Sequence, residues 1–447
     1  MGYGKCEECN QENTGYEWCN ACNAKRFQQN FKNWTSGNDD IDKFIQDSQL
    51  SATDSFKVLE WIPYDNFFNN KYVAKGGFGK VYKANWNDGY ILNWDNKNRN
   101  WEREHQHMEV ALKSLNNSEN VTLEFINEIT LHHKLIGNYY SILSLYGITQ
   151  EPDTKNYMMV LYYASHGSLR NYLDANYKLS WKDKIKNLHC IAQGLNKIHF
   201  NELIHRDLHI GNILHTGFGG NTCITDMGLS KPVDYDNTKK SIYGVLPYIA
   251  PEILRGQNYT KTGDIYSFGI IMYEVISGLP PYHNVSHNEN LAIKICEGLR
   301  PRFNIKVPHL IIRLIKRCLD ANSLNRPTAN EVYNILSQWR YELEEEEEET
   351  KETELQKLIK EADEINNNLQ TSIAFSTSLS YETHSEAIYT SRLLNFNNLP
   401  EPKNSDDYYK QYNNIISMEY SETLQIDISQ LKISLDQNNE SKDENNI

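Results

Sequence analysis

Long apolar segments are absent from this sequence. No run of about 18 consecutive apolar residues occurs, so we expect no membrane-spanning helix and no membrane partner. The first residues, Met1 to Cys6, lack the apolar stretch of a secretory signal. Cys6 also stands where a myristoylation signal needs serine or threonine. Together these absences predict a cytoplasmic protein without a lipid anchor.

A general excess of basic residues is also absent. The formal net charge is -14, and the negative charge is concentrated near the C-terminus. Residues 341–447 contain 24 acidic and 8 basic side chains, which leaves 35 acidic and 37 basic side chains in residues 1–340. Neither part is basic enough to predict a nucleic-acid partner. The acidity is therefore a property of the C-terminal tail.

Cysteine is scarce outside one short segment. The chain has eight cysteines, and four of them are scattered singly: Cys190, Cys223, Cys296 and Cys318. We expect these four to be small buried apolar residues. Because no secretory signal is evident, a reducing compartment is expected and disulfides are not.

The other four cysteines form two C-x-x-C turns near the N-terminus, Cys6 with Cys9 and Cys19 with Cys22. Each turn brings two sulfur atoms close enough to share one tetrahedral metal ion with the second pair. We therefore predict a zinc knuckle in residues 1–30, with unliganded reduced thiols as the main alternative and redox chemistry as a minor one. A segment this small has almost no core of its own, so metal should be needed to order it.

Residues 31–65 are predicted to be a linker between this knuckle and a larger domain. A short helix is expected within the linker, around Ile41 to Gln49. Three polar residues before it are suitable N-caps: Asn38, Asp39 and Asp40.

The most informative stretch of the chain is residues 205–214, which read HRDLHIGNIL. Transfer of a phosphoryl group to an alcohol needs a group that accepts the alcohol's proton, and the metal ions on the nucleotide need oxygen ligands. Asp207 and Asn212, close together in one tight loop, can supply both. Here the sequence resembles the protein kinases, whose HRDxxxxN catalytic loop it carries intact.

A glycine-rich segment precedes this loop. Residues 73–82 read VAKGGFGKVY, which predicts a strand that turns through glycines into a second strand. Glycine lets backbone amides approach phosphate oxygens. The segment resembles the kinase loop GxGxxGxV, with alanine in place of the first glycine. The resemblance implies nucleotide contacts from Ala74, Gly76, Gly77, Gly79 and Val81.

The strand Val110–Lys113 matches the kinase pattern VAIK, and a helix that carries Glu128 is expected to follow it. The resemblance implies that Ala111 lines the nucleotide and that Glu128 holds the Lys113 ammonium against the α- and β-phosphates. His132, one turn after Glu128, stands where the family usually has an apolar residue. His132 could weaken the contact between Lys113 and Glu128 or make it depend on pH. We favour the third alternative, in which the protein accommodates the histidine without either effect.

An apolar strand that ends at Leu161 resembles the strand leading to the kinase hinge. The resemblance implies that Leu161 is the gatekeeper, a bulky residue that closes the pocket behind adenine. It also implies that the backbone of Tyr162 and Ala164 forms hydrogen bonds with adenine.

Residues 226–252 resemble the metal-binding and activation segments of kinases. The segment begins with DMG, similar to DFG, and it ends with APE. The resemblance implies that Asp226 and Asn212 hold Mg²⁺ and that Met227 fills the apolar slot of the family's phenylalanine. We expect regulatory phosphorylation in this segment, with Arg206 as the receiver of the phosphate. The candidate hydroxyls are Tyr235, Thr238, Ser241 and Tyr243.

Three further features have predicted structural roles. Asp264, in a segment similar to the family's DxWSxG, is implied to hold the catalytic-loop backbone, and Arg326 is implied to pair with Glu252. Residues 85–109 are longer than the short loop usual between two strands, and their tryptophans predict a small extra hairpin.

The composition changes at Tyr341. Six consecutive glutamates occupy residues 344–349, and a solvated helix extension is favoured over a specific acidic docking element for partners. A helical pattern follows through Leu355, Leu358, Ala362 and Ile365. The tail, residues 341–447, is predicted to be mostly disordered.

The resemblance covers residues 66–340 and implies the α+β, bilobal protein kinase fold: a small lobe of antiparallel strands with one helix, and a larger helical lobe. It implies an enzyme that uses ATP and Mg²⁺ and phosphorylates protein substrates, with a role in signal transduction. Asp207 is implied to orient the attacking hydroxyl and to accept its proton.

The sequence carries conflicting signals for the acceptor hydroxyl. His209 and Val245 stand where Ser/Thr kinases usually have Lys and Thr, but the tyrosine-kinase loop patterns are also absent. The layout is most similar to the tyrosine kinase-like group, which mainly phosphorylates Ser and Thr, and His209 would be a weaker substitute for Lys near the γ-phosphate. The alternatives are dual specificity, a pseudokinase scaffold, and a zinc-dependent adaptor with an incidental kinase domain.

Overall fold

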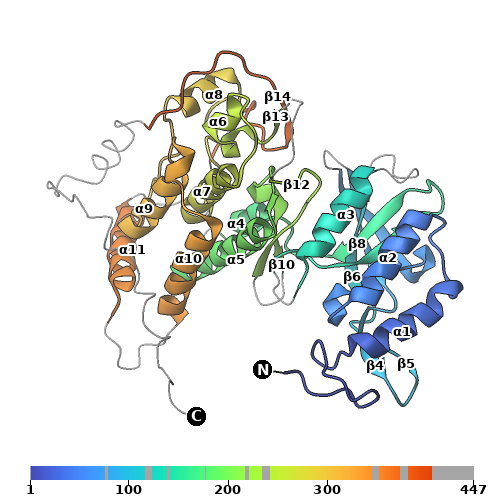
Figure 1. Ribbon diagram of the computed structural model, residues 1–447. Coiled ribbons are helices and arrows are strands. Elements are labelled where there is room, and N and C mark those ends of the chain that lie inside the picture. The colour runs from blue at the N-terminus through green and yellow to red at the C-terminus, as the bar shows by residue number, and fades with distance from the viewer. Residues whose placement is uncertain are drawn as a thin grey trace, which may run out of the picture. The chain divides into compact units, whose positions relative to one another are not determined.

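The computed structural model describes residues 2–75, 79–115, 123–137, 141–176, 178–216, 221–233, 242–344, 352–372 and 381–404. A lobe built around a β-sheet is followed along the chain by a lobe made mainly of helices (Figure 1). This arrangement confirms the predicted bilobal α+β fold. No helix in these ranges has both the length and the apolar character needed to cross a membrane.

The small lobe contains a six-stranded sheet with the strand order β1-β7-β8-β6-β3-β2. Neighbouring strands are antiparallel, except that β1 runs parallel to β7. The strands are β1 (Glu60–Trp61), β2 (Phe67–Lys75), β3 (Gly79–Trp86), β6 (Met108–Leu115), β7 (Leu145–Gln150) and β8 (Tyr157–Tyr162). Lys113 lies in the interior strand β6, opposite Val81 of β3 and Met159 of β8. Pairing with β3 on one side and β8 on the other therefore fixes the backbone of this lysine.

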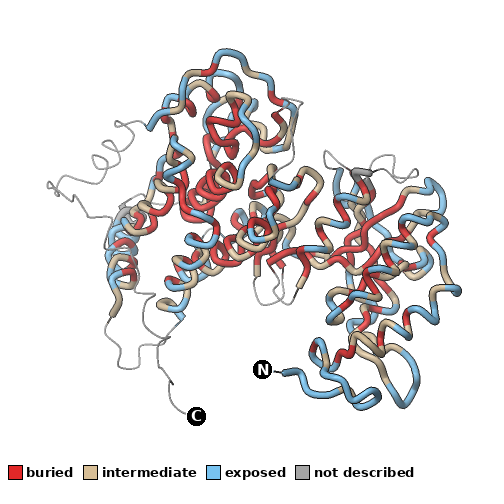
Figure 2. The backbone as a smooth tube through the Cα atoms, viewed as in Figure 1, coloured by how far each residue is buried: buried red, intermediate tan, exposed pale blue. Residues whose placement is uncertain are grey.

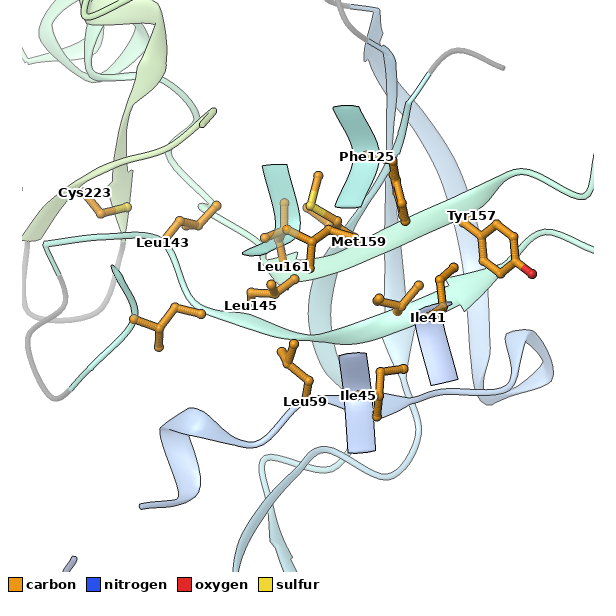
Figure 3. Packing of buried hydrophobic residues seen from close by; sticks show 14 residues of the cluster. Ile41, Ile45, Leu59, Phe125, Leu143, Leu145, Tyr157, Met159, Leu161 and Cys223 are labelled. Atoms are coloured by element: carbon orange, nitrogen blue, oxygen red, sulfur yellow. The ribbon is translucent and has the colours of Figure 1, made fainter. Parts of the chain in front are cut away.

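The segment before the sheet is part of the small lobe's core. Helix α2 (Asp39–Ser51) begins after Asn38, whose side chain accepts hydrogen bonds from the N–H groups of Asp40 and Ile41. Ile41 and Ile45 are fully buried against strands of the sheet, in one cluster with the residues that Figure 3 shows. The predicted helix is confirmed, and its buried isoleucines attach this segment to the sheet.

The cysteine segment and helix α1 (Asn20–Asn30) pack against the predicted extra hairpin. This hairpin forms from β4 (Tyr90–Asp95) and β5 (Asn100–Glu104), which confirms the prediction for residues 85–109. Trp18 is 1% exposed, its ring stacks on Trp101 at a centroid distance of 5.9 Å, and its indole N–H donates to the Ala52 carbonyl at 2.9 Å. The cysteine segment thus shares a core with the small lobe.

The remaining helix of the small lobe is α3 (Leu123–Leu135). The larger lobe contains α4 (Leu169–Ala175), α5 (Trp181–Phe200), α6 (Pro251–Leu254), α7 (Lys261–Ser277), α8 (Glu289–Cys296), α9 (His309–Cys318) and α10 (Ala329–Glu344). Helix α7 is buried along its length from Gly263 to Ser277 (Figure 2). Because a helix that is apolar on all sides must be surrounded by protein, α7 forms the centre of this lobe.

Short strands surround the catalytic loop. They are β9 (Leu203–Ile204), β10 (Ile213–Thr216), β11 (Asn221–Ile224), β12 (Lys231–Pro232) and β13 (Ile242–Gly244). The hairpin β10–β11 connects the catalytic loop to the DMG segment, and β12 pairs with β9 directly before the loop. These pairings bring the two candidate metal-binding segments together.

Parts of the C-terminal tail are ordered. Helix α11 (Glu354–Ser372) buries Leu355, Ile359 and Ala362 against the larger lobe, and the Trp181 indole donates to Asp363 at 2.7 Å. Residues 381–404, which include β14 (Arg392–Leu394), follow the surface of the same lobe (Figure 1). Helix α11 confirms the helical pattern predicted through Leu355 to Ile365. Residues 381–404 are ordered because their apolar residues find partners on the lobe. Residues 345–349 of the glutamate run and residues 405–447 lie outside the described ranges.

Candidate active site

The catalytic loop is held by a carboxylate of helix α7. Asp264 accepts hydrogen bonds from the backbone N–H groups of His205 at 2.8 Å and Arg206 at 3.0 Å. Arg206 has a backbone φ of 71°, a conformation that is unfavourable for a residue with a side chain and needs support from its surroundings. Asp264 supplies this support, as predicted. His199 of α5 also contacts Asp264, with 2.9 Å between Nε2 and Oδ2, and no sequence motif marks this histidine.

Asp207 and Asn212 lie side by side in the loop. The side-chain NH₂ of Asn212 donates to the Asp207 carbonyl at 2.9 Å and lies 3.4 Å from its carboxylate. Because Nδ2 faces Asp207, Oδ1 is the atom with which Asn212 can bind a metal ion. Asp207 is 6% exposed, so little water competes for its carboxylate.

Lys113 joins three segments of the chain. Its ammonium donates to Glu128 of α3 at 2.8 Å and to Asp226 after β11 at 3.0 Å. Burial by itself would lower the pKa of Lys113, but the carboxylates of Asp226 and Glu128 raise this pKa above its ordinary value. Burial also opposes the charge on Asp226, yet Lys113 keeps the pKa of Asp226 below its ordinary value. Lys113 and Asp226 are therefore both charged at neutral pH.

The residues present fit a magnesium ion. Lys113 and the N–H of Gly228 both bond to Oδ1 of Asp226, which leaves Oδ2 for a metal within the part of the chain that the structure describes. With the amide oxygen of Asn212, this gives a pair of hard oxygen donors of the type that Mg²⁺ binds together with phosphates.

The segments that are predicted to contact the nucleotide lie in or next to strands β2, β3, β6 and β8, as far as they are described. Ala74 pairs with Val81 across the β2–β3 hairpin, and Ala111 pairs with the buried gatekeeper Leu161. Gly79 opens β3, and Tyr162 and Ala164 follow at and just beyond the end of β8. Gly76 and Gly77 lie outside the described residues.

Two unusual residues are accommodated in the core. Met227 is buried, and the Ser230 hydroxyl donates to its sulfur at 3.5 Å. His132 is buried on α3, and its Nε2–H donates to the Leu143 carbonyl at 2.6 Å. Burial lowers the pKa of His132 to about 4, so this histidine is neutral at physiological pH. It therefore acts as a buried polar residue with a satisfied hydrogen bond, the outcome favoured from the sequence.

The described C-terminal part of the activation segment, residues 242–252, is anchored at two points. Arg326 forms the predicted ion pair with Glu252, at 2.6 and 2.8 Å. The Tyr259 hydroxyl accepts from the N–H of Tyr243 at 3.1 Å and donates to its carbonyl at 2.7 Å, and the Arg206 guanidinium lies over the Tyr259 ring. Nothing in the sequence pattern singles out Tyr259. The other candidate phosphorylation sites, Tyr235, Thr238 and Ser241, lie outside the described residues, and that expectation stays a prediction.

One residue of the tail reaches the catalytic aspartate. The Ser391 hydroxyl lies 2.9 Å from Oδ1 and 2.7 Å from Oδ2 of Asp207, and 3.2 Å from Nε2 of His209. Nδ1 of His209 accepts a hydrogen bond from the N–H of Gly211 at 3.1 Å. The neutral ring therefore carries its proton on Nε2, which can donate to Ser391. The sequence around Ser391 has no motif that predicts this contact.

The four cysteine sulfurs form a separate cluster. The Sγ atoms of Cys6, Cys9, Cys19 and Cys22 all lie within 4.8 Å of one another, with 3.8 Å between Cys6 and Cys22 and 3.6 Å between Cys9 and Cys19. In a tetrahedral site with Zn–S bonds of about 2.3 Å, neighbouring sulfurs are about 3.8 Å apart. The cluster thus has the size of a four-cysteine zinc site.

The fold and the site together define a protein kinase domain. Residues 68–336 match the family described as protein tyrosine and serine/threonine kinase, and the chain belongs to this family.

Similar proteins include kinases of both acceptor types. One is a putative serine/threonine-protein kinase/receptor of Acanthamoeba polyphaga mimivirus, 29% identical over 304 residues, which are 66% of this chain and 17% of the relative. Another is a probable serine/threonine-protein kinase of Dictyostelium discoideum, 32% identical over 233 residues, or 51% of this chain and 14% of the relative. A tyrosine-protein kinase of Girardia tigrina is 27% identical over 268 residues, covering 57% of this chain and 50% of the relative. The chain thus spans about a sixth of the length of the first two relatives.

The buried His132 leads to a prediction about stability and pH. An unfolded histidine binds a proton near pH 6.5, whereas the folded His132 does so only near pH 4. The unfolded state therefore binds more protons in this window, and the native state loses stability as the pH falls from about 6.5 to about 4. Relative to wild type, His132→Met should remove roughly 2 kcal/mol of the loss between about pH 7.5 and 5.

Urea unfolding at the two pH values measures this difference. Ile129→Met, at a buried apolar residue of the same helix, is the matched control and should keep the wild-type pH dependence, because it changes no titratable group. An unchanged pH dependence in His132→Met would contradict the assignment of a neutral buried histidine.

Proposed function

We propose that this chain is an active protein kinase that transfers the γ-phosphoryl group of ATP to serine or threonine hydroxyls of proteins. The observation that carries the proposal is the double contact of Lys113 with Glu128 and Asp226. The Lys113–Glu128 pair must be in place for phosphoryl transfer in this family, and so must the contact of the Asp226 carboxylate with Mg²⁺. A scaffold that had lost catalysis would have no need to keep them.

The chemistry assigned to each residue follows from its position. Lys113 is placed to bind the α- and β-phosphates, and Asn212 and Asp226 would hold Mg²⁺, which neutralises charge on the phosphates when bound. Asp207 orients the acceptor hydroxyl and takes its proton as the new oxygen–phosphorus bond forms. Because the three carboxylates and the lysine are fixed before the substrate arrives, little reorganisation remains for the reaction.

Serine or threonine is the favoured acceptor for two reasons. Two of the relatives described above are named as serine/threonine kinases, and a serine hydroxyl reaches Asp207 in this chain. The relative named as a tyrosine kinase keeps dual specificity as the alternative.

The residues that favour a pseudokinase fit into the protein without disturbing the site. Val245, Met227 and His132 are buried, and His209 packs beside Asp207, with 3.8 Å between Nε2 and Oδ2. Their presence therefore weakens the argument for a scaffold without catalysis, and the activity test below decides between the two functions.

We also propose that the cysteine cluster binds a structural zinc ion. The support is the spacing of the four sulfurs, which suits a tetrahedral ion, and the position of Cys19 directly beside the buried Trp18. Zinc would then stabilise the contact between the knuckle and the β4–β5 hairpin, far along the chain from the catalytic loop.

Asp207→Asn should abolish most of the activity while nucleotide binding persists. We expect phosphate transfer to a generic serine/threonine substrate to fall by about 10² to 10⁴, because the amide cannot accept the proton. Mass spectrometry of the substrate measures the transfer and distinguishes phosphoserine and phosphothreonine from phosphotyrosine. Asp47→Asn, an exposed aspartate on α2, is the matched control. A wild-type chain that binds nucleotide but transfers no phosphate would establish the scaffold function instead.

Zinc binding predicts about one zinc ion per purified chain, measured by elemental analysis. Cys9→Ser with Cys19→Ser should remove the metal and make residues 2–14 sensitive to proteolysis, since none of these residues is buried and their order depends on the metal. Cys190→Ser, at a cysteine outside the cluster, should retain the metal. Phosphate transfer should survive zinc removal once Mg²⁺ is restored, and a chain that contains no zinc as purified would refute the site.

A further inference from the structure

Residues 381–404, which we call the tail strap, lie along the larger lobe and across the active site (Figure 1). The C-terminal end of the strap is attached to the larger lobe near α6 and α8. Glu401 forms an ion pair with Arg255 after α6, and the N–H of Lys403 donates to the carbonyl of Cys296 at 3.0 Å. Leu399 is buried in the same region. The strap is thus fixed to the lobe well away from the active site.

The strap is also held just before Ser391. The backbone N–H of His287 donates to the Glu386 carbonyl at 3.0 Å, and the Tyr389 hydroxyl donates to the Pro281 carbonyl at 2.8 Å. The rings of His287 and Tyr389 meet edge to face at 4.8 Å. These contacts position the chain on the N-terminal side of the serine.

On the other side of Ser391 the strap adds a strand to the activation segment. β14 pairs antiparallel with β13, so that Arg392 lies opposite Gly244 and Leu394 opposite Ile242. Leu394 is 6% exposed, whereas its neighbour Leu393 is 65% exposed. Addition of an extended segment to a strand edge, with one side chain anchored, is a recurring way in which proteins bind peptides. The strap therefore occupies the lobe as a bound peptide substrate would.

We propose that Ser391 is an intramolecular phosphoacceptor of this kinase, presented to Asp207 by the tail strap. Its hydroxyl lies 2.7 and 2.9 Å from the two Asp207 oxygens, within the range required of a general base and the proton it removes. Nε2 of His209 donates to the same hydroxyl at 3.2 Å and fixes its orientation. The proposal rests on the proposed kinase function and names one substrate of that same site.

Neighbouring hydroxyls are not presented in this way. The Tyr389 hydroxyl is engaged by Pro281, and Thr390 is exposed. Among the described residues of the strap, Ser391 is the residue whose hydroxyl contacts Asp207. Thr390 is consequently a matched internal control for Ser391.

The reaction is an ordinary phosphoryl transfer. Oγ of Ser391 attacks the γ-phosphorus of ATP, the new Oγ–P bond forms, and the bond from that phosphorus to the bridging oxygen of ADP breaks with its electron pair kept by ADP. The hydroxyl proton passes to Asp207 and later to water. The products are phosphoserine and ADP, and no oxidant, reductant or further reactant is needed.

Before this reaction the strap excludes other protein substrates from β13 and Asp207. After it, the phosphate carries about -2 charge directly beside the Asp207 carboxylate, and this repulsion favours release of the strap. Phosphorylation of Ser391 would therefore open the site to substrates in solution.

The first test follows phosphate on Ser391. Dephosphorylated full-length chain is incubated with Mg-ATP, and each site is quantified by mass spectrometry. We expect phosphate on Ser391 in wild type and in Thr390→Ala, and none at this position in Ser391→Ala. The rate should not change over about a hundredfold range of protein concentration, because the acceptor is tethered. For the same reason, Asp207→Asn chain mixed with wild type should gain no phosphate at Ser391.

The second test measures access to the site. A synthetic peptide of residues 386–398 and a generic serine substrate are offered to Ser391→Ala, whose strap cannot be phosphorylated, and to the same variant with Leu394→Asp or Leu393→Asp added. Loss of the buried anchor in Leu394→Asp should lower the KM of both substrates by about tenfold, equivalent to about 1.4 kcal/mol of strap binding. The exposed Leu393→Asp should leave both values near those of Ser391→Ala.

The outcomes separate this proposal from the kinase function. Phosphorylation of the generic substrate without phosphate on Ser391 would overturn the proposal and leave the kinase function intact. A rate at Ser391 that rises in proportion to protein concentration would also overturn it, since the acceptor would then act between molecules. Absence of any phosphate transfer, with nucleotide still bound, would refute both.

Discussion

The ion pairs of Lys113 are the interaction on which the rest of the structure depends. A buried ammonium is costly to remove from water unless carboxylates surround it, so Lys113 is stable in strand β6 only if Glu128 and Asp226 are both in place. Glu128 brings helix α3 against the sheet, and Asp226 brings the segment after β11 to the same point. The two ion pairs of Lys113 thereby connect the small lobe to the segment that contains Asp226. This coupling is also why a nucleotide and its metal ion find a prepared site.

The second constraint is the contact of helix α7 with the backbone of the catalytic loop. Asp264 belongs to α7, the most completely buried helix of the larger lobe, and it fixes the N–H groups of His205 and Arg206. The loop can therefore present Asp207 and Asn212 in one arrangement although it is irregular. Three residues near these two sets of contacts differ from the usual kinase residues: His132, Met227 and His209. Each side chain is buried and has a hydrogen-bond partner, so the site accommodates it.

The N- and C-terminal additions use the kinase domain in different ways. The cysteine segment joins the small lobe through Trp18 and the β4–β5 hairpin, at a distance along the chain from the chemistry. The tail instead contacts the catalytic loop through Ser391. Helix α11 and residues 381–404 are attached to the larger lobe. In the first case burial of aromatic surface supplies the attachment. In the second, backbone pairing with β13 supplies it, which aligns one serine with the catalytic base.

The sequence by itself determined the fold class and predicted the catalytic residues, because Lys113, Asp207, Asn212 and Asp226 lie in short contiguous motifs that resemble those of protein kinases. It also predicted the helix after Asn38 and the extra hairpin, since capping and tryptophan-rich patterns are local signals. It did not predict the burial of Ile41 and Ile45 against the sheet, the contact of His199 with Asp264, or the path of residues 381–404 along the larger lobe. Only the tertiary structure decided that Ser391 meets Asp207, 184 residues earlier in the chain. The physical reason is that this contact depends on a strand pairing and a buried leucine on another part of the fold, and neither leaves a periodic or compositional mark near the serine.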